Sequence, residues 1–291
     1  MHERTHLLYP QLHEATVGLA GTFGPTQHRA GHRVNPPGDT TIAGALGGDR
    51  SDVRALFGFG GVHGGLLAAA LLRAARGPGP SDRLPVETTT YFLRPVLAMP
   101  DLERLAVREG GRTTITSASA TVDGTLAATS TTVSSTAREP STPVVSTVAP
   151  DITPLDLAER FVIPPEFVPI STKMEIRPAT PGLPYSGATV PELCAWIRLT
   201  ESVHDPFERI LILADALAPS YAAILTDLRM APSVRMTVRF TPAVARLPFD
   251  WVLVRATTAE AGTDGWLGEH VTIWAPDGEL LATSTQLRAI R

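Results

Sequence analysis

The chain has 291 residues, enough for one large domain or two of ordinary size, and its hydrophobic content of 43% is normal for a globular protein. Its formal net charge is −4 and no basic block is visible, so sustained binding to nucleic acid or to an anionic membrane is not expected. The single cysteine, Cys194, excludes an internal disulfide and a cysteine-rich metal site. No signal-peptide core follows Met1 and no apolar run is long enough to span a membrane, so we expect a soluble cytoplasmic protein.

The first half of the chain predicts one buried helix followed by strands. Residues 1–50 are rich in Gly, Pro, Thr and His and predict irregular structure, with a strand near residues 40–46. Residues 66–76 are apolar nearly all round and are followed by Gly77 and Pro78, which predicts a buried helix that ends there. Runs rich in Thr, Val and Ala predict strands at residues 86–93, 102–108, 113–122 and 125–134.

The second half repeats this order after a stretch rich in Pro, Ser and Thr. Residues 135–172 predict the crossover between the halves, with one short helix near residues 155–161. Residues 188–200 predict a strand, residues 205–225 a helix, and residues 233–240, 251–259, 266–274 and 280–290 further strands. A helix followed by several antiparallel strands is typical of an α+β protein and not of βαβ units.

A repeated line of sequence supports two similar halves. Residues 123–131, DGTLAATST, return 154 positions later as residues 277–285, DGELLATST. Each copy is a turn signal followed by β-forming residues, which predicts one fold used twice. The copies differ at the next position, where the first has Thr132 and the second has Gln286. Halves that differ in polar residues predict a single site between them.

Several motifs in order resemble acyl-CoA thioesterases of the double hot-dog type, also called thioesterase II or TesB-like. In the first half they are Phe59-Gly60-Gly61, the Ala-rich helix and residues 91–95, YFLRP; in the second they are Leu213-Ala214-Asp215, the strand 233–240 and residues 281–286, LATSTQ. The resemblance covers nearly everything from about Gly58 to the last residue, whereas residues 1–50 match less well.

The resemblance implies an α+β fold of two tandem units, each a long helix wrapped by an antiparallel sheet. We expect an N-terminal hot-dog at residues 1–135, a linker at 136–172 and a C-terminal hot-dog carrying the catalytic residues at 173–291. It also implies hydrolysis of fatty acyl-CoA, or of a carrier-bound acyl thioester, to the free acid without a metal or organic cofactor. Family members usually pair, so a homodimer or larger even assembly is expected.

Asp215 is the candidate base, because a carboxylate in the apolar run 210–219 is costly unless something uses or satisfies it. Pro219 offers no N–H to the carbonyl of Asp215, so the helix should kink or end there. A desolvated carboxylate binds protons more strongly, which suits a general base. The alternative is a carboxylate that reaches the surface or caps the next turn.

The resemblance implies that Ser233 and Gln286 complete the site by holding a water with Asp215. Gln286 shares a strand face with Ser284, and its amide can donate to one oxygen while accepting from another. Ser233 stands where the family usually has Thr, and Thr237 is the runner-up if the register differs. Both Ser233 and Gln286 could instead be ordinary strand residues.

The start of the first helix supplies candidates for oxyanion and substrate binding: Gly61, His63, Gly64 and Gly65. Glycines there allow close approach to the backbone, and exposed N–H groups at a helix start suit a developing oxyanion. His63 departs from the thioesterase II pattern and could be only a helix cap. Arg94 is a candidate for the CoA phosphates, although structural pairing is the stronger interpretation.

Two rival functions remain from the sequence. A hot-dog hydratase or dehydratase would need a His and an Asp converging on one site, which only His63 and Asp215 could supply here. A non-catalytic acyl-binding protein would retain binding without turnover. No Gly-x-Ser-x-Gly elbow, P-loop, dinucleotide fingerprint or His-Glu-x-x-His motif is visible.

Overall fold

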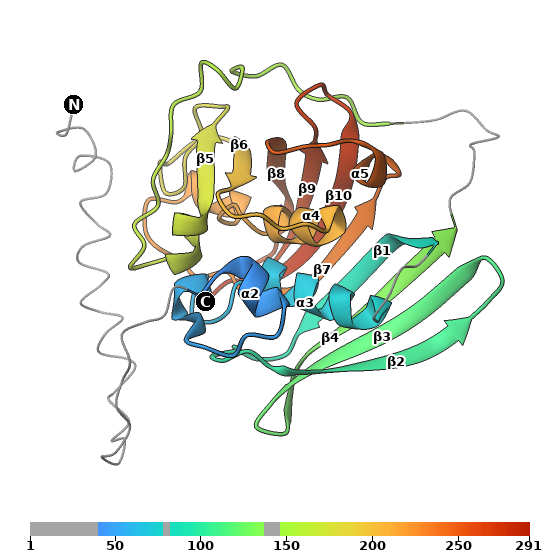
Figure 1. Ribbon diagram of the computed structural model, residues 1–291. Coiled ribbons are helices and arrows are strands. Elements are labelled where there is room, and N and C mark those ends of the chain that lie inside the picture. The colour runs from blue at the N-terminus through green and yellow to red at the C-terminus, as the bar shows by residue number, and fades with distance from the viewer. Residues whose placement is uncertain (1–39, 78–81, 137–145) are drawn as a thin grey trace, which may run out of the picture.

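The computed structural model describes residues 40–77, 82–136 and 146–291, and its strands form one antiparallel sheet in the order β2-β3-β4-β1-β7-β10-β9-β8-β6-β5. The strands are β1 (Arg83–Phe92), β2 (Asp101–Glu109), β3 (Thr113–Val122), β4 (Thr125–Thr136), β5 (Met174–Pro178), β6 (Glu192–Leu199), β7 (Ser233–Phe240), β8 (Val252–Ala261), β9 (Trp266–Trp274) and β10 (Leu280–Ala289). The sheet curves around two helices that lie side by side, α3 (Gly64–Arg76) and α4 (Pro206–Ala214) (Figure 1). Shorter helical segments are α2 (Ile42–Leu46), η2 (Val53–Leu56), η3 (Pro169–Lys173), η4 (Ser220–Ile224) and α5 (Ala243–Arg246).

The two halves of the chain present the same order of elements. α3 is followed by β1 to β4, which lie in the order β2-β3-β4-β1, and α4 is followed by β7 to β10, which lie in the order β7-β10-β9-β8. β1 and β7 meet at the centre of the sheet, where Thr89 pairs with Thr237. The two Asp-Gly turns join equivalent strands, and Gly124 and Gly278 both have positive φ, at 72° and 87°. Such turns favour glycine, which explains why this part of the repeat is readable in the sequence.

The core lies between the helices and the concave face of the sheet. α3 is buried along most of its length, with Leu66, Leu71 and Leu72 fully enclosed, as its composition predicts. Burial of one such leucine contributes about 1.5–3 kcal/mol, so this helix is held mainly by packing. No helix in the described ranges is long and apolar enough to cross a membrane.

A second, smaller core lies on the outer face of the sheet in the second half. The segment before β5 packs there, because Trp274 donates its ring N–H to the carbonyl of Thr147 and Trp196 donates to that of Thr153, each over 3.0 Å. Part of the expected crossover, including Thr147 and Thr153, therefore packs on the outer face of the sheet. Residues 137–145, which were also expected to belong to the crossover, lie outside the described residues.

Three expectations about local structure are wrong. Residues 42–46 form a helix instead of a strand, because Thr41 caps it by accepting a hydrogen bond from the Gly44 N–H. No helix forms at residues 155–161, where Leu157 and Ala158 both bond back to the Pro154 carbonyl in a single turn. The helix expected at residues 205–225 ends at Ala214, and the separate segment η4 follows it.

Candidate active site

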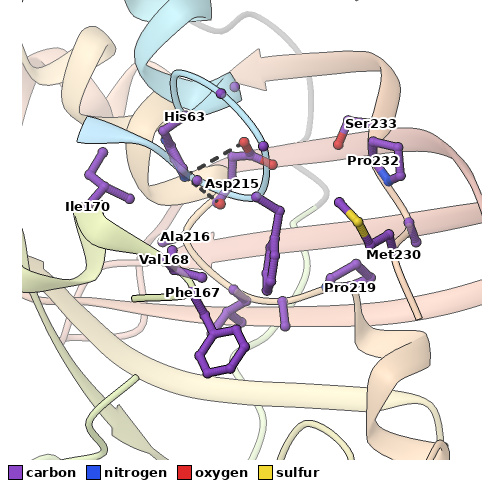
Figure 2. Close-up of a pocket in the computed structure, with 18 of the residues that line it drawn as sticks. His63, Phe167, Val168, Ile170, Asp215, Ala216, Pro219, Met230, Pro232 and Ser233 are labelled. Atoms are coloured by element: carbon purple, nitrogen blue, oxygen red, sulfur yellow. Dashed lines mark hydrogen bonds and ion pairs between the residues drawn. The ribbon is translucent and has the colours of Figure 1, made fainter. Parts of the chain in front are cut away.

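A cavity of about 310 Å³ opens where the start of α3, the end of α4 and the start of β7 meet. Its lining is largely apolar, including Phe92, Phe167, Ile170 and Met230, and several of these side chains surround Asp215 in Figure 2. Within the described ranges, Asp215 is the only carboxylate that lines it. Burial raises the pKa of the cavity-lining Tyr185 to about 12, so its hydroxyl stays protonated at neutral pH.

Asp215 sits at the C-terminal end of α4, where the helix is forced to stop. Pro219 has no N–H, so the Asp215 carbonyl lacks the helical partner it would otherwise have. That carbonyl instead accepts a hydrogen bond from Nε2 of His63, over 2.8 Å. The expectation that the helix kinks or ends at Asp215 is confirmed: the helix ends there, and the Asp215 side chain lines the cavity.

Two glycines at the start of α3 allow the two helices to meet at this carboxylate. The Gly65 N–H donates to Oδ2 of Asp215 over 2.9 Å. A Cβ on Gly64 would lie 2.7 Å from that Oδ2, and a Cβ on Gly65 would lie 2.5 Å from the Leu211 carbonyl oxygen. A side chain at Gly65 would have to displace the backbone of α4, and one at Gly64 would have to displace the Asp215 carboxylate, which gives the two glycines after His63 their physical reason.

His63 is the N-cap of α3 and links this helix to the end of α4. Its Nδ1 accepts from the Leu66 N–H over 3.3 Å, so the ring proton resides on Nε2, which faces the Asp215 carbonyl. Its Nε2 also lies 3.7 Å from Oδ2 of Asp215, beyond hydrogen-bond distance. Both ring nitrogens are thus engaged by backbone groups, and Figure 2 shows the contacts of His63 with Asp215.

Ser233 and Gln286 meet beside the same helix end. The Ser233 hydroxyl donates to Oε1 of Gln286 over 2.8 Å, and Nε2 of Gln286 donates to the Ala214 carbonyl over 3.1 Å. Ser233 lines the cavity, whereas Gln286 is buried behind it and is not part of the lining. A register shift pairs Ser233 with Arg288 and so turns Ser233 toward the helix side of the sheet.

A buried ion-pair network next to Asp215 was missed from the sequence. Arg288 lines the cavity, and its Nη2 lies 3.6 Å from Oδ1 of Asp215. Its Nε donates to Oε2 of Glu269 over 2.7 Å, while Oε1 of Glu269 accepts from the Ser220 N–H over 2.5 Å. Strand alternation could have placed Arg288 on the face of Gln286 and Ser284, but nothing in the sequence identifies Glu269 as its partner.

The remaining residues predicted for the site differ in whether they line the cavity. Gly61, Gly64 and Arg94 line the cavity, whereas Gly65 acts from behind it through the N–H bond to Asp215. Thr237 does not line the cavity; its hydroxyl lies 3.0 Å from that of Thr89 on the neighbouring strand. Across the described parts of the chain, no three His, Cys, Asp or Glu side chains gather where they could hold a metal ion.

Comparisons with known proteins agree with this geometry. Residues 55–136 match the family model for the acyl-CoA thioesterase N-terminal domain, and residues 148–290 match that for the C-terminal domain. No curated protein matches in sequence.

Solved structures with the same fold span nearly the whole of both chains. A conserved protein of unknown function with a hot-dog fold from Alicyclobacillus acidocaldarius is 24% identical with a TM-score of 0.75, covering 82% of this chain and 90% of that one. A protein from Thermobifida fusca described as a candidate thioesterase II is 25% identical with a TM-score of 0.71, covering 83% and 91%. The acyl-CoA thioesterase II TesB2 of Mycobacterium marinum is 20% identical with a TM-score of 0.63, covering 78% and 88%.

The fold is therefore a hot-dog fold, α+β with a large antiparallel sheet. The chain belongs to the acyl-CoA thioesterase family and is a thioester hydrolase.

Proposed function

We propose that this protein hydrolyses fatty or related acyl-CoA to the free acid and CoA, with a water activated by Asp215. The observation that carries the proposal is the asymmetry of this carboxylate. Its Oδ2 is held by the Gly65 N–H, while its Oδ1 accepts no hydrogen bond from any described residue. A fixed carboxylate with one free oxygen at an apolar cavity suits a general base.

Ser233 supplies the second contact to the water. Oε1 of Gln286 accepts a hydrogen bond from the Ser233 hydroxyl, and Nε2 of Gln286 donates to the Ala214 carbonyl, so the lone pairs of Ser233 are free to accept. One water can then donate to Oδ1 of Asp215 and to Oγ of Ser233, with its oxygen directed at the thioester carbon. In this scheme Gln286 positions Ser233 and does not touch the water.

The reaction runs through a tetrahedral intermediate. The water oxygen bonds to the carbonyl carbon, its proton moves to Asp215, and the carbonyl electrons move to oxygen. The Gly64 N–H is the best candidate to hold that oxyanion, because it lies in the first turn of α3, lines the cavity and has no acceptor among the described residues. Collapse of the intermediate breaks the C–S bond, and the thiolate of CoA leaves with the proton that Asp215 returns.

The cavity offers separate surroundings for the two parts of acyl-CoA. Its apolar lining suits the acyl chain. Arg94, Arg229 and Arg291 also line it, and none of the three has an ion-pair partner in the described residues. Arg229 and Arg291 are neighbours, because the Arg291 N–H donates to the carbonyl of Met230 over 2.8 Å. Free guanidinium groups suit the phosphates of CoA, although a carrier-bound phosphopantetheine would also use them.

The geometry disfavours a hydratase that uses His63 as its acid or base. His63 and Asp215 do lie close together, as that rival requires, but both ring nitrogens of His63 are engaged by backbone groups. A proton-shuttling histidine needs at least one of them free.

The division of the chain and its assembly belong to the same proposal. We assign two tandem hot-dog units, residues 1–135 and 173–291, joined by residues 136–172, in a cytoplasmic protein of lipid metabolism. A homodimer or larger even assembly is expected, because β2 lies at the edge of the sheet and is exposed along its whole length, including Leu105 at 65% and Val107 at 57%. Light scattering that gives only the 31 kDa monomer mass at micromolar concentration would contradict it.

The test of the function is a panel of acyl-CoA substrates of different chain lengths, with free thiol measured after mixing. We expect saturable release of CoA for at least one chain length, abolished by Gly64→Leu, because any Cβ at Gly64 would collide with Oδ2 of Asp215. Tight binding of acyl-CoA without thiol release from any substrate would show a non-catalytic acyl-binding protein.

A further inference from the structure

Arg288 is a buried cation whose role the scheme above leaves unexplained. Its side chain is only 7% exposed, and a charge taken out of water is costly unless it is well compensated. Glu269, at 1% exposure, supplies that compensation through the bond between its Oε2 and Nε of Arg288. Nη1 of Arg288 donates to the Ala231 carbonyl over 3.3 Å, so the guanidinium is fixed from two sides.

The remaining nitrogen of this guanidinium faces the reaction site. Nη2 makes no hydrogen bond to any described residue, and it lies 3.6 Å from Oδ1 of Asp215, the oxygen left free for the water. The separation is short enough for strong attraction and too long for a hydrogen bond that would block that oxygen. Arg288 can therefore act on the charge of Oδ1 without occupying it.

We propose that Arg288 is a positioning residue for the thioesterase reaction: it holds Asp215 in its anionic form with Oδ1 open to water, and Glu269 sets the strength of that effect. The inference rests on the proposed role of Asp215 as the base. A positive charge within about 4–6 Å favours the ionised form of a carboxylate. Glu269 lies behind the guanidinium and offsets part of its field at Asp215.

Among the described residues, Arg288 and His63 are the only basic side chains with a nitrogen within 4 Å of the Asp215 carboxylate, and only Arg288 faces Oδ1. From α3 it faces the Gly65 N–H and the His63 ring, whose Nε2 lies 3.7 Å from Oδ2, and from β7 it faces the uncharged Ser233. From β10 it faces Arg288, with Glu269 of β9 behind. Arg229 and Arg291 also line the cavity, and neither forms an ion pair with Asp215.

The test is the pH dependence of thiol release at saturating acyl-CoA, measured for Arg288→Gln, Arg288→Lys and Glu269→Gln. In Arg288→Gln the cation is lost, so the acid limb of the pH profile should move to higher pH by about one unit or more. In Glu269→Gln the anion is lost, so the acid limb should move to lower pH; the shift should be about half a unit, because Glu269 is farther from Asp215 than Arg288 is. Arg288→Lys keeps a positive charge and should leave the limb close to that of the wild type.

Opposite shifts distinguish this role from a structural one, since loss of packing alone would lower rates without moving the limb in two directions. Arg255→Gln is the matched control, because Arg255 pairs with Glu192 over 2.7 Å outside the cavity. A limb that is unmoved or raised in Glu269→Gln would overturn the inference, even if Arg288→Gln fails to fold. If Asp215→Asn keeps the wild-type rate, the proposed base is wrong and the failure lies there instead.

Discussion

Replacement of Asp215 by Asn tests the proposed chemistry with little change in shape. The amide oxygen can still accept from the Gly65 N–H, which bonds Oδ2 over 2.9 Å in the wild type. The amide nitrogen then stands where Oδ1 stood and cannot take a proton from water. Loss of one general base costs about a hundredfold or more in turnover, which corresponds to about 2.7 kcal/mol in the barrier.

The stability cost of the same change is small by comparison. Asn removes the attraction between Oδ1 and Nη2 of Arg288 at 3.6 Å, but Arg288 keeps its closer bond to Glu269. We estimate a loss of about 1–2 kcal/mol, or about 2–8 °C in melting temperature. Asp250→Asn is the control, since Asp250 is 66% exposed and its ion pair in the described part of the chain is with Arg198.

The assay is thiol release at saturating acyl-CoA, with melting temperature recorded for each variant. Rates for Asp215→Asn within about twofold of the wild type would refute the reasoning, because a folded enzyme would then work without its proposed base. A large loss of rate in Asp250→Asn would instead show that turnover follows stability alone.

Three further predictions follow from the same structure. Gln286→Ala should lower turnover by about tenfold to a thousandfold because Ser233 loses its acceptor, whereas Thr132→Ala should cost slight stability and leave turnover nearly unchanged; equal effects on rate would rule out a single site. Arg229→Ala should raise KM for acyl-CoA severalfold and leave KM for a phosphate-free acyl thioester unchanged; equal changes for both substrates would exclude a phosphate contact. Hydrogen bonds from Arg177, and also from Arg198, hold the pKa of Glu175 below its usual range. Glu175→Gln should therefore lower the melting temperature at pH 7 by about 2–4 °C, and this difference should disappear as the pH falls through the lowered pKa of Glu175. An equal loss of melting temperature at pH 3 would show that the effect is not ionic.

Much of the sheet was readable from the sequence because its strands alternate β-forming residues between sharp turns. Residues 113–122, 233–240 and 266–274 were predicted with the bounds that β3, β7 and β9 have. Short apolar runs were less informative: residues 42–46 fit a strand or a helix, and the Thr41 cap decided the outcome. The helix expected at residues 205–225 was too long, because a proline removes the hydrogen bond to the carbonyl four residues before it, so Pro219 ends α4 near Asp215.

The site was predicted in part. Asp215 was visible as a carboxylate in an apolar run, and the structure places it and Ser233 at one cavity. The indirect position of Gln286 could not be read, because it depends on a register shift between β7 and β10. The ion pair between Arg288 and Glu269 could not be predicted from the sequence either, since Glu269 lies directly opposite Gln286 and contacts Arg288 diagonally across the strands.

The contacts around Asp215 show how the two halves of the chain would share the one proposed site. The carboxylate comes from the second half, but the N–H that fixes it belongs to Gly65, and the ring that holds its carbonyl belongs to His63, both in the first half. The equivalent strand position in the first half holds Thr132, whose hydroxyl lies 3.0 Å from that of Thr88 inside a buried cluster. That cluster satisfies its own polar groups and lines no part of the cavity at Asp215. The first half therefore contributes the Gly65 N–H and the His63 ring, the second contributes Asp215 and Arg288, and the proposed site needs both halves.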